Sequence, residues 1–368
     1  MKNQVAKICI LSILILGNIA CRLLAADRSF AEINQDTSWV WLKKAVKNME
    51  TSTRLSDFSR QNYRDHSFYA ERYEKINRYL YLAAKKPPVD FSCCKTSSVP
   101  AVIESTDRIP DCIRSLMLDY AYGIEIGNPG LIHKALSCVL LLDSALGKNP
   151  YIYYQLVRAA NINIIFYSIR KSFAESPLNL LSVKEINELV TLLKRTKSEI
   201  KISWEHALEF ESAIDFQILQ KKLPFIESIR SNKTKMESCI SRYRRFLLSA
   251  SKAIKNTQND ETAMNILRNE SEKINEFFYT PIVGSEWIRT KQQTALKLDA
   301  IICLLECIEF YKTHGYYPPK RSILTQGVEY VPKEKGFDLI IGGNEVLAYG
   351  YKIVRPVSKS SLKNLFQD

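Results

Sequence analysis

Apolar residues recur along most of the chain with the three- and four-residue spacing that is typical of an amphipathic helix. The longest such segment, 291–313, is apolar over most of its circumference, and its polar residues form one narrow stripe that contains Asp299, Glu306 and Glu309. A helix that is apolar on so many sides must pack against several neighbours. We therefore expect 291–313 to be the central helix of the core. Its acidic residues interrupt the run of about 20 apolar residues that a membrane span requires.

Similar patterns predict further helices, separated by short breaks that contain glycine, proline or serine. They cover 38–49, 67–85, 111–126, 131–146, 151–173, a segment that begins after Ser182, 203–222 and 233–255. Ser182 and Glu185 have the spacing of a capping box, which fixes the start of one of these helices. Helices joined by such short breaks pack as antiparallel neighbours.

After residue 319 the spacing changes to the period of two that is typical of strands. Two such runs, 337–341 and 346–353, flank the turn sequence Gly342-Gly343-Asn344-Glu345 and predict a hairpin. The expected fold class is therefore mainly α, an antiparallel multi-helix bundle or array with a small C-terminal β-hairpin. The expected organisation is a signal peptide at 1–26, an N-terminal helical segment at 27–86, a Pro/Ser/Thr-rich linker at 87–110, a helical core domain at 111–313, and the hairpin with a basic tail at 314–368.

The first 26 residues have the pattern of a secretory signal peptide. Lys2 and Lys7 precede an apolar run at 8–17, and this run is too short for a membrane span. Cleavage is expected near Ala25 or Ala26, while lipidation at Cys21 and an uncleaved anchor are the alternatives. We therefore expect an exported protein of the periplasm or envelope, with anchoring through the N-terminus left open.

The charge of the chain favours an anionic partner. Removal of residues 1–26 takes away three basic residues and no acidic one, which lowers the formal net charge from +13 to +10. This excess suits lipid headgroups or cell-wall polymers, and no motif for nucleic acid is present, so nucleic acid is not an expected partner. The segment 230–255 holds eight basic residues and one acidic residue, with Arg242, Arg244 and Arg245 near its centre. It is interpreted either as a peripheral contact with anionic lipid or as the solvated face of an outer helix.

A second basic pattern lies in the predicted helix 67–85, where Arg72, Lys75 and Arg78 alternate with several tyrosines. Such alternation is found on surfaces that bind single-stranded nucleic acid or glycans. The alternative is a packed aromatic face beside a solvated charged face.

Four of the nine cysteines lie in predicted helices and are expected to be buried free thiols: Cys138, Cys239, Cys303 and Cys307. Cys93, Cys94 and Cys112 lie in or beside a predicted loop, and one bridge among them is an alternative for an oxidising compartment. Cys303 and Cys307 are one helical turn apart, but no second pair completes a site for a soft metal. No metal and no cofactor are therefore expected.

The sequence lacks the short motifs of several enzyme classes, among them His-Glu-x-x-His, Gly-x-Ser-x-Gly, the phosphate-binding glycine loop and Cys-x-x-Cys. The remaining candidates for catalysis are Glu211 and Asp215, which lie one turn apart on the apolar face of the predicted helix 203–222. The alternative is structural: a carboxylate on a buried face is held by a cation from a neighbouring helix, and Arg158 is the leading candidate for Glu211.

The ending His314-Gly315-Tyr316-Tyr317-Pro318 follows an apolar helix and resembles the helix-to-sheet segment of type II secretion pseudopilins. The layout of residues 111–353 also resembles an uncharacterised family of exported or membrane-anchored bacterial proteins, whose members share tandem core helices and this ending. Those members carry an Asp-Pro-Phe turn before the last hairpin, whereas this chain has Glu334-Lys335-Gly336-Phe337. The resemblance implies a helical fold and an exported protein, and it implies no activity.

Together these features favour an exported, non-enzymatic helical scaffold or binding protein of the bacterial envelope. Its expected partner is another protein or an envelope polymer. The alternatives are an envelope hydrolase or transferase that uses Glu211 and Asp215, and a secretion-system component similar to a pseudopilus.

Overall fold

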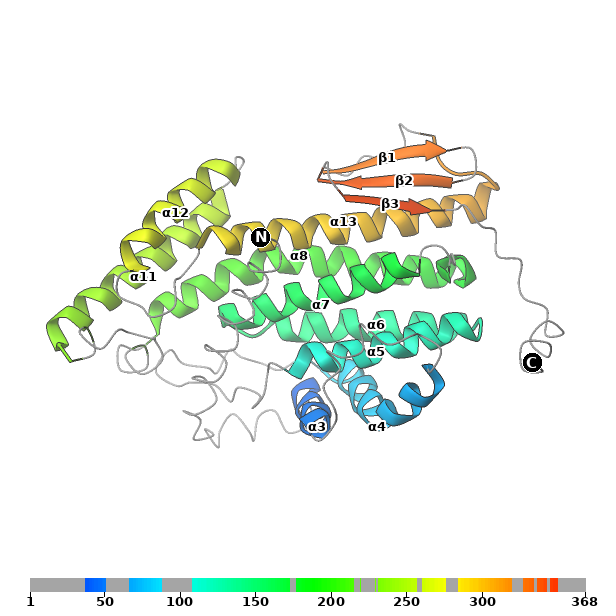
Figure 1. Ribbon diagram of the computed structural model, residues 1–368, viewed down its shortest axis with the longest axis horizontal. Coiled ribbons are helices and arrows are strands. Elements are labelled where there is room, and N and C mark those ends of the chain that lie inside the picture. The colour runs from blue at the N-terminus through cyan, green and yellow to red at the C-terminus, as the bar shows by residue number, and fades with distance from the viewer. Residues whose placement is uncertain are drawn as a thin grey trace.

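In the part of the chain that the structure describes, the fold is mainly α, with one small sheet that follows the last helix (Figure 1). The computed structural model describes residues 37–50, 66–87, 108–172, 177–214, 219, 229, 231–256, 260–275, 284–319, 327–333, 336–342 and 345–349. Its helices and its C-terminal strands confirm the expected fold class. The predicted signal peptide, Cys21, Cys93, Cys94, Asp215 and the tail after residue 349 lie outside the described residues.

The helices follow one another with short connections over most of the described chain. They are α3 (Ser38–Glu50), α4 (His66–Lys85), α5 (Ile109–Glu125), α6 (Pro129–Gly147), α7 (Ile152–Lys171), the short 3-10 helix η5 (Pro177–Leu180), α8 (Val183–Ala213), α11 (Lys233–Asn256), α12 (Asp260–Asn275) and α13 (Gly284–His314).

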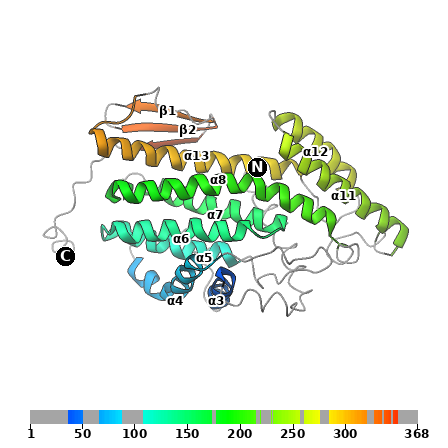
Figure 2. The same ribbon diagram turned by 180° about the vertical axis from the view of Figure 1, so that it is seen from behind.

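The helices are arranged in layers along the long axis of the molecule (Figures 1 and 2). The pair α5 and α6 lies beside the pair α7 and α8, and α13 runs along the outer side of that second pair. The sheet lies on α13, while α3 and α4 cover α5 and α6 on the opposite side. The pair α11 and α12 packs against one end of α8 and α13.

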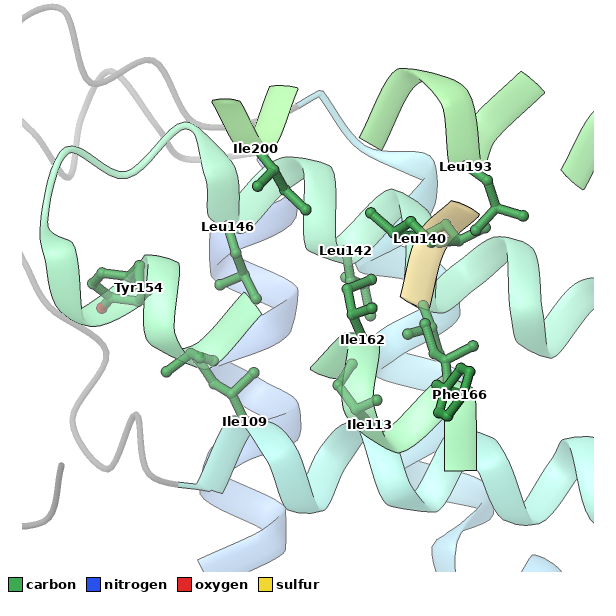
Figure 3. Packing of buried hydrophobic residues seen from close by; sticks show 14 of the residues in the cluster. Ile109, Ile113, Leu140, Leu142, Leu146, Tyr154, Ile162, Phe166, Leu193 and Ile200 are labelled. Carbon is green, nitrogen blue, oxygen red and sulfur yellow. The ribbon is translucent and has the colours of Figure 1, made fainter. Parts of the chain in front are cut away.

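The core is continuous through these layers because α6 and α7 are apolar on several sides (Figure 3). Side chains from α5, α6, α7 and α8 meet between the helices, and representative residues are Ile113, Leu142, Ile162, Phe166 and Leu193. Among the described helices, α6 alone is long and apolar enough to cross a membrane by length and composition. Of its apolar stretch, 56% is buried, as expected for a core helix.

The polar stripe of α13 faces α8. Asp299 accepts hydrogen bonds from the Lys197 ammonium through both carboxylate oxygens, at 2.6 and 2.8 Å. About two turns further along α13, Glu306 lies 2.8 Å from the ammonium of Lys194. These pairs explain why a helix with an otherwise apolar surface keeps a line of acids, since α8 supplies the cations that match them. Both lysines are about half exposed, so solvent screens the pairs, and their main effect is to fix the register of the two helices.

The predicted break between two helices near residue 203 is wrong, because α8 continues without interruption from Val183 to Ala213. The hydroxyl of Ser203 donates to the carbonyl of Ile200 within the same helix at 3.2 Å and also accepts a hydrogen bond from Arg158 at 2.7 Å. A serine whose side chain is satisfied in this way does not end a helix. The capping box of Ser182 and Glu185 at the start of α8 is confirmed. The helix α12 was not predicted.

The sheet contains three antiparallel strands in the order β1 (Val328–Lys333), β2 (Gly336–Ile341) and β3 (Glu345–Tyr349). Strands β2 and β3 form the expected hairpin, with Leu339 opposite Leu347. Strand β1 was not predicted because it contains Pro332, which weakens a strand pattern in sequence. Proline is tolerated there because β1 is an edge strand of the sheet.

The His314-Gly315-Tyr316-Tyr317-Pro318 segment turns the chain from α13 towards the sheet. Gly315 ends the helix with a φ of +79°, and its N–H donates to the carbonyl of Tyr311 at 2.8 Å. Tyr317 then stacks on Tyr311, with ring centroids 4.6 Å apart, and meets Phe337 of β2 edge to face at 5.2 Å. The turn therefore carries an aromatic bridge between the core helix and the sheet.

Candidate functional site

A cavity of about 560 Å³ lies between α4, α5 and α6, next to the turn that joins α5 to α6. One stripe of α4 forms its longest wall, because residues three, four and seven apart face the same side of a helix. The walls combine apolar and aromatic surface with polar groups from all three helices. Those that matter for the chemistry are Glu74, Arg78, Tyr81, Lys85, Asp119 and Lys134.

The polar centre of the cavity is a hydrogen bond from the Tyr81 hydroxyl to the Asp119 carboxylate, at 2.7 Å. Burial raises the pKa of Asp119 above its ordinary value, and hydrogen bonds from Tyr81 and Asn77 and the charge of Lys134 oppose that rise. Burial and the charge of Asp119 also raise the pKa of Tyr81. Tyr81 is therefore a neutral hydrogen-bond donor here, and this pair provides no activated nucleophile.

The cavity is held in shape by a second, fully buried contact. The hydroxyl of Ser115 donates to the side-chain oxygen of Asn77 at 2.7 Å, and the Asn77 amide donates to the carbonyl of Ser115 at 3.1 Å. This exchange locks α4 to α5. It fixes the position of the residues that follow on α4, so the Tyr81–Asp119 pair is supported by packed structure on one side.

Three basic side chains line the same cavity: Arg78 and Lys85 from α4, and Lys134 from α6. The Lys134 ammonium lies 3.9 Å from the centre of the Tyr81 ring, in cation–π contact. None of the three forms an ion pair with a residue in the described part of the chain. The cavity therefore presents positive charge together with the acceptors Glu74 and Asp119, an arrangement suited to binding.

A second hollow of about 640 Å³ lies between α6 and the start of α8, and it contains a serine, a histidine and a glutamate. Glu188 Oε2 lies 3.2 Å from Nε2 of His133, and Ser137 Oγ lies 3.3 Å from the same nitrogen. A serine hydrolase needs the acid and the nucleophile on opposite nitrogens of the ring, so that the ring can pass a proton between them. Both partners share Nε2, so this group does not have the geometry of a catalytic triad.

Glu211 has a structural position at the end of α8. Its Oε1 accepts a hydrogen bond from the backbone N–H of Ile152 at 2.9 Å, at the first position of α7, where Tyr151 supplies no side-chain cap. Tyr243 of α11 also bonds to this carboxylate, and its pKa is well above the ordinary value because of burial and the Glu211 charge. Glu211 is half-buried and caps α7 from a neighbouring helix.

The expected contact between Arg158 and Glu211 is wrong. Arg158 is 1% exposed and pairs with Asp143 of α6, whose side chain is fully buried; Nε and Nη2 lie 3.0 and 2.9 Å from Asp143 Oδ2. Its Nη1 donates to Ser203 and to Gln155. Arg158 therefore joins α6, α7 and α8 at the centre of the core. The pairing was mispredicted because Asp143 lies in an apolar stretch that gives no sign of a buried ion pair.

The three arginines proposed for anionic contact do not share one environment. Arg242 and Arg245 are exposed on α11. Arg244 is half-buried, and its Nη2 donates to the carbonyl of Ile214 at 2.5 Å, just past the end of α8. Arg244 therefore ties α11 to α8, and only the other two lie on the outer surface.

The described cysteines are all buried, and none of the thiols of Cys112, Cys138, Cys303 and Cys307 forms a disulfide; the fifth is Cys239. This confirms the interpretation of the four helical cysteines, whereas a bridge through Cys112 is not formed. Burial raises the pKa of the thiols of Cys112, Cys138 and Cys307, which makes them poor nucleophiles. Within the described ranges, no group of three or more His, Cys, Asp or Glu side chains is placed to hold a metal ion.

Comparisons of the chain with protein-family models, with curated proteins and with solved structures found no match. The resemblance noted for the segment after α13 therefore stays a prediction, and the functional argument depends on the geometry described above.

The α4–α5–α6 cavity was not predicted as a site, although the basic and aromatic character of α4 was noticed. Arg78 and Tyr81 supply part of that character, and both line the cavity. Asp119 gave no signal, because one acid in an amphipathic helix looks like a solvated position. A tyrosine and an acid 38 residues apart can be paired only once the packing of α4 on α5 is known.

We expect Glu211→Gln to lower the free energy of unfolding by only about 0.3–1 kcal/mol, because the amide oxygen still accepts from Ile152 while the favourable charge at the helix N-terminus is lost. Glu211→Ala should cost about 2–4 kcal/mol, since the N–H of Ile152 then has no cap and the buried hydroxyl of Tyr243 loses its acceptor. Urea denaturation measures both. A loss of several kcal/mol for Glu211→Gln would instead show that a buried cation depends on this carboxylate.

Proposed function

We propose that the chain is an exported, non-enzymatic helical scaffold or binding protein of the bacterial envelope, and that α11 contacts anionic lipid. The observation that carries the proposal is the composition of the exposed face of α11. Four exposed basic residues lie within an arc of roughly 100° on this helix: Lys235, Arg242, Arg245 and Lys252. Glu237 is the single acidic residue of α11.

The apolar side of α11 packs against the core of the protein. This position limits how the helix could contact a membrane. Met236, Ile240, Tyr243 and Leu247 are buried against the rest of the molecule. The apolar side therefore does not enter a bilayer, and contact with lipid would use the basic face. Leu248, which is 45% exposed, lies next to that face and supplies an apolar group at the surface. A basic face with one exposed leucine favours lipid headgroups over a soluble polymer.

Neither of the described groups that were considered for catalysis has a catalytic arrangement, and this favours a binding role over an enzymatic one. Glu211 is engaged as the cap of α7, and the His133 group lacks the geometry of a catalytic relay. Export stays an expectation from residues 1–26. Asp215 lies outside the described residues and adds no second carboxylate to the argument.

Vesicle flotation tests the contact. We expect the protein to float with vesicles that contain phosphatidylglycerol, at low salt and less at high salt, and to stay unbound with phosphatidylcholine alone. At about 1 kcal/mol for each basic residue near the surface, Arg242→Gln with Arg245→Gln should weaken vesicle binding about 30-fold. The matched control is Lys43→Gln with Lys47→Gln, which removes the same charge from exposed positions of α3 and should have little effect.

Two outcomes would contradict the lipid contact. One is an absence of flotation with anionic vesicles at low salt. The other is an equal loss of binding for the α3 and α11 variants, since this would show that the total charge of the protein, and not the α11 face, determines binding. Retention on an anionic cell-wall polymer without vesicle binding would favour the polymer as the partner.

A further inference from the structure

The α4–α5–α6 cavity has the size and lining of a site for a small molecule. Its volume of about 560 Å³ falls within the range of about 300–1,000 Å³ that ligand pockets occupy. Leu82, Tyr122 and Leu131 give it apolar and aromatic walls, and the polar groups converge from three helices. The buried Asn77–Ser115 exchange fixes the α4 wall before any ligand arrives.

The charges of the cavity favour an anion at one part of a ligand. Arg78, Lys85 and Lys134 outnumber the two acids, and none of these three cations is ion-paired within the described part of the chain. Leu131 also lies in the first turn of α6, at the positive end of the helix dipole. A phosphate suits this lining, because its oxygens accept several charge-assisted hydrogen bonds at once.

The acids favour hydroxyl groups at another part of the ligand. A carboxylate can accept about four hydrogen bonds, and the bond from Tyr81 accounts for one of those to Asp119. Glu74 adds a further acceptor at the exposed edge. A ligand that carries an ammonium group is disfavoured. The Lys134 ammonium already occupies the face of the Tyr81 ring, 3.9 Å from its centre, and would repel a second positive charge there.

From these contacts we infer that the α4–α5–α6 cavity binds a phosphorylated polyol. The phosphate lies among Arg78, Lys85 and Lys134, and the hydroxyl groups donate to Asp119 and Glu74. The same chemistry occurs in a free polyol phosphate and in the headgroup of a glycerol-based phospholipid. The site is independent of the basic face of α11, which belongs to a different part of the molecule.

Calorimetric titration of the whole protein with glycerol 3-phosphate tests the inference. We expect binding of glycerol 3-phosphate, weaker binding of inorganic phosphate and of phosphoethanolamine, and none of glycerol. Lys134→Gln should weaken the binding of glycerol 3-phosphate about tenfold or more, as expected for the loss of a charge-assisted contact. Asp119→Asn should weaken the binding of glycerol 3-phosphate without weakening that of inorganic phosphate, because the variant removes a hydroxyl acceptor and a negative charge beside Lys134. Lys184→Gln, an exposed lysine of α8, is the matched control and should change neither.

A micellar short-chain phosphatidylglycerol distinguishes the two sources. Binding that depends on Lys134 in the same way assigns the cavity to a lipid headgroup, whereas binding of the soluble phosphate alone assigns it to a free metabolite. The inference is overturned if no probe binds, if Lys134→Gln leaves the affinity unchanged, or if phosphoethanolamine binds more tightly than glycerol 3-phosphate. Arg242→Gln with Arg245→Gln should leave this titration unchanged, so failure at the cavity and failure at α11 are seen separately.

Discussion

Replacing Arg158 with methionine should lower the free energy of unfolding by about 3–5 kcal/mol, which is the usual result of breaking a buried ion pair from one side. The guanidinium is 1% exposed and the Asp143 side chain is fully buried, so water cannot replace the lost partner. Asp143 Oδ1 already has no hydrogen-bond partner among the described residues, and the change would also leave Oδ2 without its cation. Urea denaturation followed by circular dichroism measures the loss.

The double variant Arg158→Met with Asp143→Leu is the control that identifies the cause. It removes both charges and fills the space with apolar groups, so it should recover most of the lost stability. Arg195→Met removes an exposed arginine from its pair with Glu199 and should cost only about 0.3–0.5 kcal/mol. A double variant as unstable as the single one would show that the shape of Arg158, and not its charge, is what the core requires.

The loss for Arg158→Met should also depend on pH. Burial raises the pKa of Asp143, and Arg158 opposes that rise, so removal of the arginine lifts the pKa of the folded state further above the unfolded value. A carboxyl whose folded pKa is raised contributes stability below its unfolded pKa, which is about 4 for aspartate. That contribution is lost as the pH rises through the folded pKa. The deficit of the variant relative to the natural chain should therefore be small at acid pH and full near neutral pH.

The helix boundaries show how far the sequence predicts the fold. Helix positions follow from local patterns, and α6 and α13 were predicted to within a few residues of most of their ends because glycine, proline and apolar spacing are local signals. The start of α13 was placed too late, because 284–290 mixes polar and apolar residues. The break predicted near Ser203 failed because the hydrogen bond that satisfies this serine comes from Arg158, 45 residues away.

Pairing between distant residues was the part that the sequence did not provide. The polar stripe of α13 was visible, but the lysines of α8 that match it could be identified only from the packing of the two helices. Asp143 and Arg158 are 15 residues apart on consecutive helices, yet a second carboxylate, Glu211, had the more suggestive setting. Where several partners are available to a charge, the periodicity of a sequence does not choose among them.

Replacing Phe337 with alanine should release the sheet from α13 without unfolding the helices. Phe337 is fully buried and meets both Tyr317 and Tyr330, with ring centroids 5.2 and 5.3 Å away. Removal of a buried phenylalanine costs about 3–5 kcal/mol, and three short strands need a packed neighbour to stay folded. Amide hydrogen exchange in β1 to β3 should therefore accelerate by more than about 100-fold.

The helices supply the internal reference for that measurement, because exchange in α6 and α7 should keep its natural rate. Tyr316→Ala is the matched control, since this ring lies in the same turn but is 57% exposed and contacts Phe310 and His314 without reaching the sheet. It should leave exchange in the sheet nearly unchanged. If Phe337→Ala accelerates exchange in α6 and α7 as much as in the strands, the sheet and the helical core unfold as one unit. The aromatic bridge through Tyr317 would then contribute to the stability of the whole molecule and not only to the docking of its sheet.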